Sequence, residues 1–336
     1  MLRTTTDDRV VLCCPDKFRG SLTADEAARA LGAGVGRTGR TARRLPLADG
    51  GEGTLAVLCP RADELRTARV TGPLGDPVDA HWGMRDRTAV VEMAQASGFV
   101  LVEGPNDPVR ATTRGTGELI RIALETEPER VIVAVGGSAT VDGGLGALEA
   151  LDFDLRGVDV VIACDVDTRF SDAARVFGPQ KGADAEAVAE LERRLERLAA
   201  RYRLERGVDV AALPGSGSAG GLAGGLAAIG ARLVPGASLV ADVVGLRAEL
   251  ASASLVLTGE GRFDATSLAG KVVGHVLREA DGLGVPAAVI AGDADPALAA
   301  GYRVVTLASL AGSTEAAFRD AARLAADAAA LVAGGP

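Results

Sequence analysis

Aromatic residues are scarce in this sequence: they make up 3% of its 336 residues, with a single tryptophan. Histidine is scarcer still, because His81 and His275 are the only two. Neither lies in the spacing of a metal-binding motif, which argues against a histidine-based zinc site and against a general-base histidine. The sequence also lacks a Gly-x-Ser-x-Gly element, and without it an α/β-hydrolase triad has no anchor.

Cysteine is sparse as well, with Cys13, Cys14, Cys59 and Cys164 as its four positions. None of the spacings gives a Cys-x-x-Cys pair, which argues against a zinc ribbon and against a redox-active dithiol motif. Cys13 and Cys164 lie inside apolar, strand-like runs, where we expect buried and reduced thiols. Because reduced thiols are typical of cytoplasmic proteins, we expect this compartment.

Long hydrophobic runs are missing too. The N-terminus carries two acidic residues ahead of a short apolar run that ends at Pro15, whereas a secretory signal has positive charge followed by a longer apolar stretch. No stretch approaches the ~20 uninterrupted apolar residues of a membrane-spanning helix. We therefore predict neither a secretory signal nor a membrane span.

Acidic residues outnumber basic ones, since 45 Asp and Glu face 36 Lys and Arg, for a net charge of −9. This balance argues against a nucleic-acid-binding protein, which needs a concentrated basic face. A nucleotide substrate stays compatible, because a few local cations or a Mg²⁺ ion suffice for a triphosphate. With 336 residues, 48% of them apolar, the chain is long enough for two domains, each with its own core.

The sequence does contain five short apolar runs, residues 10–13, 131–135, 158–164, 255–258 and 287–291. The last four are followed directly by glycine, aspartate or both. Continuous apolar strands of this kind are typical of a parallel sheet with both faces covered, so we predict an α/β fold. In such folds ligands bind at the carboxyl ends of the strands, where the Gly and Asp clusters lie.

Three further segments indicate other elements. A helix is predicted over residues 21–33, with Thr23 and Glu26 as its capping box. Residues 78–102 alternate in short runs, contain the only tryptophan and are typical of antiparallel strands. Residues 183–203 are charged and heptad-like, which predicts a surface helix that covers the core.

Two glycine-rich stretches imitate nucleotide-binding motifs. Residues 34–41 fit a dinucleotide fingerprint and nearly fit a P-loop, but they follow a predicted helix instead of a strand. We therefore interpret them as a helix end and a turn. Residues 215–221 precede a helix-compatible segment, and their glycines either let the backbone approach a pyrophosphate or let a helix pack tightly. The sequence leaves both interpretations open.

Carboxylates placed among glycines give the strongest functional signal. They form four clusters, at residues 49–54, 136–144, 164–167 and 258–264. A single acid beside glycine is a common turn residue, but four clusters, most of them at strand ends, indicate a common function. Phosphoryl transfer needs these parts, because carboxylates hold Mg²⁺, backbone amides surround phosphate oxygens and cations offset the charge of the transferred group.

Nine segments resemble, in their order along the chain, the signatures of bacterial glycerate kinases of the glycerate 2-kinase type. They are residues 14–22, 46–54, 91–98, 114–120, 136–144, 163–165, 177–182, 214–221 and 257–271. Segments 177–182 and 259–264 are the most specific. The resemblance implies ATP- and Mg²⁺-dependent phosphorylation of D-glycerate, with 2-phosphoglycerate as the expected product and 3-phosphoglycerate as the neighbouring possibility.

The resemblance also implies an architecture. We expect two unlike α/β domains around a cleft, the first Rossmann-like with a parallel sheet and formed by residues 1–75 and 246–336. The second, residues 76–245, has a mixed sheet and is inserted in the first. The expected partners are glycerate and ATP, with no nucleic acid and no membrane, and the oligomeric state stays open between monomer and homodimer.

Roles for individual residues follow as a hypothesis. Asp49 orients the acceptor hydroxyl and takes its proton, and Lys181 offsets charge on the transferred group. Arg19 and the Ser21 region hold the substrate carboxylate near the amino end of the first helix. The other substrate-binding candidates are Lys17, Glu52, Glu260 and Asp264, of which the last two could hold the nucleotide ribose instead. The phosphate-binding candidates are Gly136, Gly137, Ser138, Gly215, Gly217 and Gly220, and the Mg²⁺ ligands are Asp142 and Asp165.

The sequence departs from the family pattern at three places, one of which is residues 168–172, where the family tends to have an Asn-Pro-Leu stretch. Arg19 stands where the family has lysine, and its planar fork is longer than an ammonium group. The segment between Leu151 and Val158 is clipped. Arg19 and the clipped segment motivate one alternative, a catalytically impaired relative that acts as a ligand-binding protein. The other alternative is an NAD(P)-dependent oxidoreductase of small hydroxy acids that uses the glycines of residues 215–220.

Overall fold

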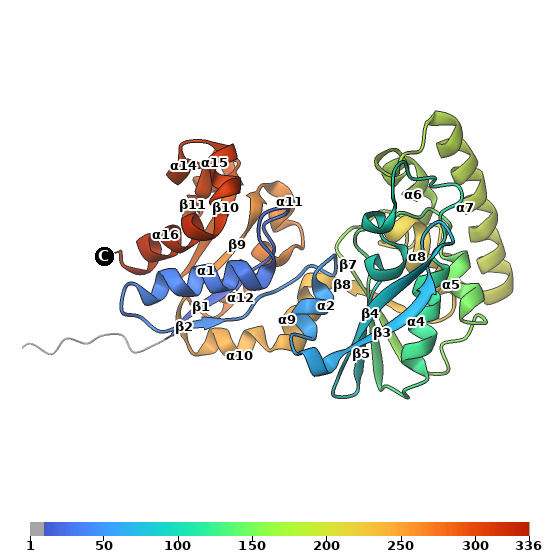
Figure 1. Cartoon of the computed structure of the whole chain (residues 1–336), viewed down its shortest axis with the longest axis horizontal. Coiled ribbons are helices and arrows are strands. Elements are labelled where there is room, and N and C mark those ends of the chain that lie inside the picture. Colours follow the sequence, from blue (N-terminus) through green and yellow to red (C-terminus); the bar gives the residue numbers. More distant parts are fainter. Residues whose placement is uncertain (1–9, 336) are drawn as a thin grey trace, which may run out of the picture. The chain divides into compact units, whose positions relative to one another are not determined.

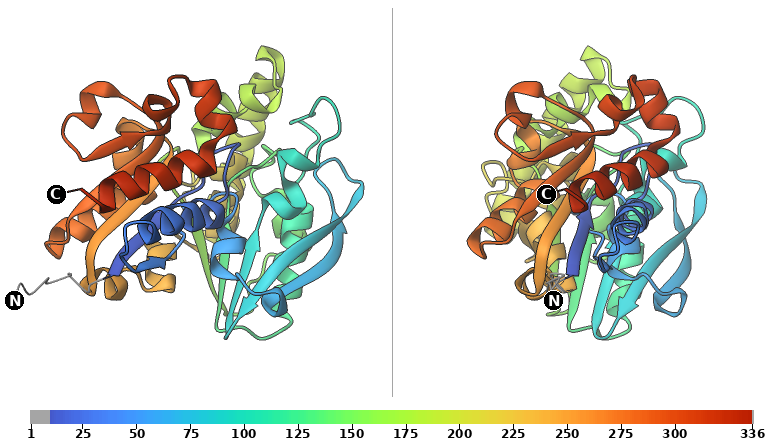
Figure 2. Two further views of the ribbon diagram at one scale, coloured as in Figure 1. Left: turned by 60° about the vertical axis from the view of Figure 1, so that its left-hand side comes forward. Right: turned by 90° about the vertical axis from the view of Figure 1, so that its left-hand side faces the viewer.

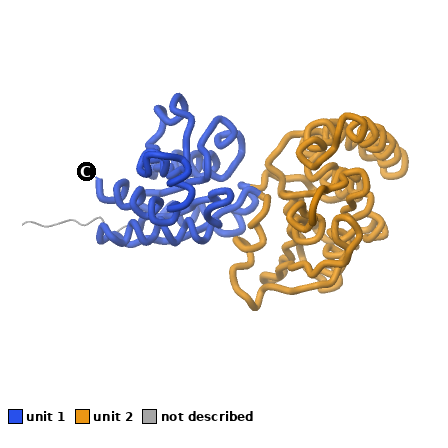
Figure 3. The backbone as a smooth tube through the Cα atoms, turned by 45° about the horizontal axis from the view of Figure 1, so that its top comes forward, with its two compact units in different colours: residues 1–49, 237–336 blue, residues 50–236 orange. Residues whose placement is uncertain are grey.

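The computed structural model describes residues 10–335, which divide into two compact units (Figure 3). Unit 1 is discontinuous: it runs to Asp49 and resumes at Ala237, while Gly50–Gly236 form unit 2. The sequence-based limits, 76 and 245, lie later in the chain, and the first of them places the strand of residues 65–71 in the first domain. This strand pairs within the sheet of unit 2. The prediction of no secretory signal rests in part on residues 1–9, which lie outside the described residues.

Unit 1 contains a five-stranded sheet in the order β11-β10-β9-β1-β2 (Figure 1). All its neighbouring pairs are parallel, as the continuous apolar runs predicted. The strands are β1 Val10–Pro15, β2 Ala42–Arg44, β9 Ala253–Phe263, β10 Ala287–Ala294 and β11 Val304–Thr306. The predicted runs 10–13, 255–258 and 287–291 fall inside β1, β9 and β10.

Helices cover both faces of this sheet. Along β10, Ile290 packs in one core with residues of α1 and α16, whereas its neighbour Val289 packs in another with Val273 of α12. α1 and α16 lie side by side (Figure 2). The helices are α1 Ala24–Gly36, α9 Gly236–Val244, α10 Leu246–Ala251, α11 Ala265–Leu268, α12 Val272–Gly282, α13 Pro296–Ala299, α14 Leu307–Ala311, α15 Thr314–Arg319 and α16 Ala321–Ala333.

The first helix, α1, has the predicted capping box, although it begins at Ala24, three residues later than predicted. The Glu26 backbone N–H donates to the Thr23 hydroxyl at 3.2 Å, and the Thr23 N–H donates to the Glu26 carboxylate at 2.9 Å. This reciprocal capping box satisfies backbone donors at the start of the helix. The helix ends at Gly36, and Gly39 has a φ of 79° in the following turn. Residues 34–41 are therefore a helix end and a turn, as predicted.

Unit 2 contains a mixed six-stranded sheet in the order β3-β4-β5-β6-β7-β8. The strands are β3 Leu65–Thr71, β4 Pro77–Arg85, β5 Thr88–Glu92, β6 Arg130–Ala134, β7 Asp159–Cys164 and β8 Arg232–Pro235. β4 is antiparallel to both of its neighbours, β3 and β5, and β5 to β8 are parallel. The predicted antiparallel segment 78–102 gives β4 and β5, but after Glu92 the chain becomes helical.

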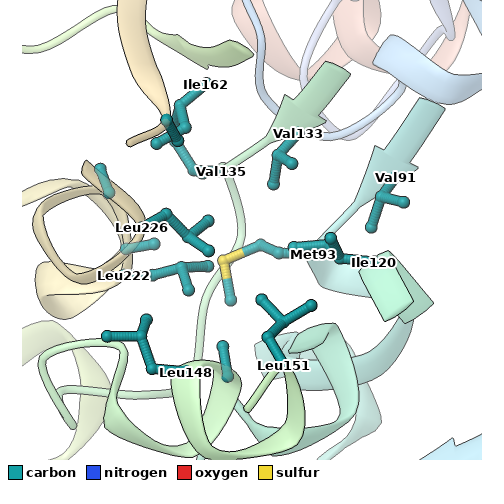
Figure 4. Packing of buried hydrophobic residues seen from close by; sticks show 14 of the residues in the cluster. Val91, Met93, Ile120, Val133, Val135, Leu148, Leu151, Ile162, Leu222 and Leu226 are labelled. Atoms are coloured by element: carbon teal, nitrogen blue, oxygen red, sulfur yellow. The ribbon is translucent and has the colours of Figure 1, made fainter. Parts of the chain in front are cut away.

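The core of unit 2 is built mostly from aliphatic side chains. Met93 lies at its centre, between Val133 of β6, Leu151 just after α5 and Leu222 of α8 (Figure 4). The α-helices are α2 Thr54–Leu58, α3 Ala94–Ser97, α4 Arg114–Leu124, α5 Leu145–Ala150, α6 Ala173–Phe177, α7 Ala185–Arg206 and α8 Leu222–Ala228. The 3-10 turns are η1 Ala62–Glu64, η2 Phe99–Leu101, η3 Phe170–Asp172, η4 Pro179–Lys181 and η5 Ser218–Gly221. The predicted surface helix 183–203 is α7, which buries leucines on one side.

The four cysteines carry free thiols. Cys13 is buried, as expected, whereas Cys164 is only partly buried. Among residues 10–335, no helix combines the length and the apolar content that a bilayer crossing requires.

The clipped segment after α5 forms a tight turn. Asp152, Phe153 and Arg156 have positive φ angles of 51°, 57° and 53°, a conformation that non-glycine residues rarely adopt. The Phe153 ring lies against α7, with the guanidinium groups of Arg201 and Arg206 5.5 and 5.2 Å from its centroid. Cation–π contacts with α7 thus hold this short connection in place.

Replacing Phe153 should destabilise unit 2. In Phe153→Leu the side chain stays apolar but loses its ring, and we expect the free energy of unfolding to fall by about 1–2 kcal/mol, because two cation–π contacts of about 0.5–1 kcal/mol each are lost. Urea unfolding followed by the fluorescence of Trp82, a buried residue of unit 2, measures the change. The control Arg203→Gln alters an exposed α7 residue paired with Asp209. A Phe153→Leu midpoint equal to that of the control would contradict the assignment.

Candidate active site

The strand order of unit 1 reverses at β1. From β1 the chain proceeds to β2 on one side, while the neighbour on the other side, β9, follows only after unit 2. In open α/β sheets, ligands bind at the carboxyl ends of the strands at such a reversal. The register pairs Pro15 with Gly259, so that Asp16 and Glu260 come next on the two strands. Two acidic residues therefore lie where this type of sheet binds ligands.

Asp16 is buried, with 6% of its surface exposed. Its backbone N–H donates to the Gly259 carbonyl at 2.8 Å, and its Oδ1 accepts the Lys17 N–H at 2.7 Å. Burial raises the pKa of Asp16 to about 7; the Lys17 ammonium opposes this shift, and the charges of Asp49 and Glu260 add to it. Sequence reasoning missed Asp16 because it has no glycine beside it. Its place after a predicted buried strand was the available signal.

Lys17 connects Asp16 with the predicted catalytic residue Asp49. Its Nζ lies 3.4 Å from Asp49 Oδ1 and 3.8 Å from Asp16 Oδ1. Both carboxylates are largely buried, with 14% and 9% of their side chains exposed. A single ammonium thus lies beside two carboxylates in a place with little water.

Glu260 completes this group of acids. Burial raises its pKa, the Ser267 hydroxyl and the Lys271 ammonium lower it, and Asp264 and Asp49 raise it further. Its Oε1 is buried and has no hydrogen-bond partner. The structure therefore brings together three predicted site residues, Lys17, Asp49 and Glu260.

Other predicted residues of unit 1 have local partners. Asp264 caps α11, because its Oδ1 accepts the N–H and the hydroxyl of Thr266 at 2.9 and 2.7 Å. Both hydrogen bonds lower the pKa of Asp264, and the one from the Thr266 hydroxyl has the larger effect. The Ser21 hydroxyl donates to the Phe18 carbonyl at 3.1 Å, and the Arg19 side chain is exposed. The first turn of α1 already carries Asp25 and Glu26, which compete there with a substrate carboxylate.

In unit 2, the loop after Asp49 is anchored at the ends of strands. The Val135 N–H, just after β6, donates to the Gly50 carbonyl at 3.0 Å. A Cβ atom at Gly136 would lie 2.5 Å from Gly51 Cα, so the loops meet through glycines. Glu92, at the end of β5, accepts the N–H groups that open α2, from Gly53 at 3.1 Å and Leu55 at 3.0 Å.

Glu92 was also missed as a site residue, although it belongs to one of the matching segments. Its buried carboxylate, 2% exposed, holds the start of α2 next to Glu52. Glu52 itself is exposed. Glu92 thus fixes the loop backbone, and Glu52 is the acid of this loop that water reaches.

Lys181 is the most deeply buried cation of the candidate site, with 4% of its surface exposed. Its Nζ donates to the Ser138 hydroxyl at 2.6 Å and to the Thr140 carbonyl at 2.7 Å. The Asn106 amide in turn donates to the carbonyls of Lys181 and Ala139 at 2.8 and 2.9 Å. Burial lowers the pKa of Lys181 to about 7, against the nearby charge of Asp142.

Asp142 is held by hydrogen bonds from nearby backbone and hydroxyl groups. Its carboxylate accepts four hydrogen bonds: the Thr113 N–H and hydroxyl, both at 2.8 Å, the Gly144 N–H at 3.1 Å and the Gly146 N–H at 3.3 Å. In this arrangement it fixes the loop before α5 and carries a negative charge near Lys181. Its predicted role as a metal ligand would compete with these four donors.

The loop of residues 215–221 packs against the same strand ends. A Cβ atom at Gly217 would lie 2.3 Å from the Arg169 carbonyl oxygen, and one at Gly220 would lie 2.0 Å from that of Thr140. A Cβ atom at Gly215 would lie 3.0 Å from Cys164 Sγ, so this loop lies beside the partly buried Asp165. Close packing thus accounts for Gly217 and Gly220.

Polar atoms without partners remain near this loop. The Thr140 and Ser218 hydroxyl oxygens are buried and lack a hydrogen-bond partner, and so does Asn106 Oδ1. Buried polar groups are nearly always satisfied in folded proteins, by protein, water or ligand. Within residues 10–335, no group of three or more His, Cys, Asp and Glu is arranged to hold a metal ion.

All lysines of the sequence interact with residues of the candidate site. Lys17, Lys181 and Lys271 are the only lysines among the 36 basic residues of the sequence. The first two bind site carboxylates and hydroxyls directly, and Lys271 interacts with Glu260. Unit 1 offers ammonium groups and carboxylates for a hydroxyl or a cation, and unit 2 offers an ammonium group, hydroxyls and backbone amides for an anion. This is a set suited to phosphoryl transfer.

Comparison with known proteins agrees with this chemistry. The model of the glycerate kinase family matches residues 11–157 and 152–334. The two matched parts meet at the tight turn after α5, which is the segment that the sequence indicated as clipped.

The chain is 38% identical over 302 residues to glycerate 2-kinase from Escherichia coli, covering 78% of this chain and 79% of that protein. It is 37% identical over 335 residues to glycerate kinase from Halalkalibacterium halodurans, covering 88% and 87%. The crystal structure of a putative glycerate kinase 2 from Salmonella typhimurium LT2 superposes with a TM-score of 0.81, at 34% identity and 97% coverage of both chains. The chain belongs to the glycerate kinase family.

Proposed function

We propose that the protein phosphorylates D-glycerate with ATP and releases 2-phosphoglycerate and ADP. The observation that supports this most strongly is the environment of Lys181. Its ammonium is buried beside Ser138 of the loop after β6, and among the described residues this ammonium forms no ion pair with a carboxylate. A buried charge is retained when it has a partner, and a phosphate group supplies the missing negative charge.

On the nucleotide side, ATP is the phosphate donor that membership of this kinase family implies. We assign Lys181, the Ser138 hydroxyl and the backbone of Gly136–Gly137 to its phosphates. Mg²⁺ binds ATP mainly through phosphate oxygens and needs only one or two carboxylates from a protein. Asp165 fits as such a ligand, whereas Asp142, with its four donors, fits better as a residue that positions the loop.

On the substrate side, we assign the acceptor hydroxyl to the carboxyl groups around Lys17. Asp49 orients the hydroxyl, and the Lys17 ammonium offsets the charge of the neighbouring acids. The exposed side chains of Arg19 in unit 1 and Glu52 in unit 2 are each accessible from solvent. Glycerate offers a carboxylate for such a cation and hydroxyl groups for such acids.

The structure argues against the oxidoreductase alternative. A dinucleotide fingerprint uses its glycines to bring the backbone close to a pyrophosphate. Here a Cβ atom at Gly217 or Gly220 would meet the carbonyl oxygen of Arg169 or Thr140. The Gly217 N–H donates to the Thr168 carbonyl at 2.9 Å, so these glycines serve the packing of the protein's own backbone. The impaired relative differs from an active kinase only in turnover, and a direct assay separates the two.

A coupled assay tests the activity and its product together. We expect ADP release that depends on D-glycerate, ATP and Mg²⁺, and conversion of the product by enolase alone, because enolase acts on 2-phosphoglycerate. A requirement for phosphoglycerate mutase would assign the 3-isomer instead. Thermal stabilisation by glycerate without ADP release would favour the ligand-binding relative.

Lys181→Arg tests the phosphate assignment while keeping the charge. A guanidinium is larger and planar, and it does not fit a buried position built for one nitrogen. We expect kcat/KM for ATP to fall by about 10²–10³-fold, the range for losing one preorganised electrostatic contact, with a similar loss in Lys181→Met. The control Arg175→Lys changes an exposed cation of α6, paired with Asp172, and should be neutral. Normal ATP kinetics in Lys181→Arg would refute the assignment.

A further inference from the structure

Three carboxyl groups meet where the strand order of unit 1 reverses. Asp16 follows β1, Glu260 lies on β9, and Asp49 follows the segment after β2. Each interacts electrostatically with at least one of the other two. The Oε1 atom of Glu260 is buried and has no hydrogen-bond partner, so this carboxyl group can accept a further donor. The hydroxyl group of a ligand is a donor of this kind.

The three acids are not equivalent, because Lys17 lies closer to Asp49 than to Asp16. The distances to its Nζ are 3.4 Å and 3.8 Å, and Asp16 is the more deeply buried of the two. The second contact of Lys17 with Asp16 is a backbone hydrogen bond of 2.7 Å to Oδ1. Asp49 therefore has the better charge partner, and Asp16 carries a negative charge that its surroundings compensate less fully.

We propose that Asp16 is the group that accepts the proton of the acceptor hydroxyl, while Asp49 holds the Lys17 ammonium and orients the hydroxyl. The sequence alone gave the proton to Asp49. In the step, the hydroxyl oxygen forms a bond to the γ-phosphorus of ATP, and the bond from this phosphorus to the β,γ-bridging oxygen breaks. The bridging oxygen keeps the electron pair and leaves with ADP, and the hydroxyl proton passes to the Asp16 carboxylate. This inference rests on the proposed function.

The proton affinity of Asp16 suits this role. A general base works best when its pKa lies near the working pH, and burial raises the pKa of Asp16 to about 7. The charged groups that face it are Lys17 beside it, Asp49 from the segment after β2 and Glu260 from β9. The first of these lowers the pKa, and the two acids raise it.

The burial of Asp16 also makes the stability of the folded protein depend on pH in the absence of substrate. The pKa of Asp16 rises from 3.8 to about 7 on folding, so between these pH values the folded state binds more protons than the unfolded state. Stability contributed by this group is therefore present at low pH, falls as the pH rises through this window, and stays lost above about pH 7. An asparagine cannot ionise and avoids the loss.

Asp16→Asn should therefore become more stable relative to the wild type as the pH rises from 5 to 8, measured by Tm. The matched control is Asp293→Asn on β10 of the same sheet, a carboxylate paired with Arg262, for which no such rise is expected. A pH-independent difference in Tm for Asp16→Asn would overturn the proposed ionisation of Asp16, whatever the activity.

The kinetic test compares pH profiles of kcat/KM for glycerate. We expect the wild-type profile to have an acidic limb, that is, a loss of activity below about pH 7, because its base becomes protonated there. Asp16→Asn should lose about 10²–10⁴-fold in kcat, the contribution of a general base, and its residual activity should no longer follow that limb. Asp49→Asn should also lose activity but keep the limb. Asp16→Glu retains a carboxyl group and should recover part of the rate, which keeps the test valid if the asparagine variant folds poorly.

Two outcomes separate this inference from the proposed function. Wild-type protein that releases no ADP with glycerate refutes the proposed function. Active wild-type protein with normal turnover in Asp16→Asn, or with a limb that disappears in Asp49→Asn and persists in Asp16→Asn, refutes only the role of Asp16.

Discussion

Charge held away from water at the ends of parallel strands is the constraint on which both units depend. In unit 1 it raises the pKa of Asp16 to about 7, and in unit 2 it lowers the pKa of Lys181 to about 7. Burial is the main cause of both shifts, although their directions are opposite, because it disfavours whichever form is charged. In each case one neighbour of opposite sign, Lys17 or Asp142, restores only part of the ordinary value. Such incomplete compensation is costly for folding and is typical of sites where a ligand supplies the remaining charge.

Close packing of loops makes this burial possible. The strand ends of unit 2 are covered by loops that approach one another through glycine, as Gly51 and Gly136 do, and Gly220 meets the Thr140 carbonyl. This carbonyl also accepts a hydrogen bond from Lys181. A side chain at Gly220 would displace the loop that holds the lysine. The glycines around the candidate site therefore act mainly on the protein's own backbone, and the polar contacts to a ligand fall to Ser138, Lys181 and the acids.

The sequence predicted those parts of the fold in which local pattern and tertiary environment agree. β1, β6, β7, β9 and β10 are continuous apolar runs because helices cover both faces of their sheets, whereas β2 and β11 have three residues each and β3 is an exposed edge strand. Short and polar strands carry no periodic signal. For the site, glycine-flanked acids led to Asp49 and Glu260 but not to Asp16 or Glu92. The character of these two depends on burial and on partners distant in sequence, such as Gly53 and Glu260.

The use of lysine bears on whether the chain is an active kinase. Arginine supplies the cations of every surface ion pair described in the structure, and only Lys17, Lys181 and Lys271 depart from this preference. An ammonium group is compact and directs three donors from one nitrogen, whereas a guanidinium needs a planar space. In Lys181 two of these donors reach Ser138 and Thr140 in a buried position, which arginine could not occupy without moving the loop. Arg19 stands where the resemblance implies a lysine; its side chain is exposed and has room for the larger group. The substitution thus falls where geometry is permissive, whereas the buried Lys181 has the compact ammonium group.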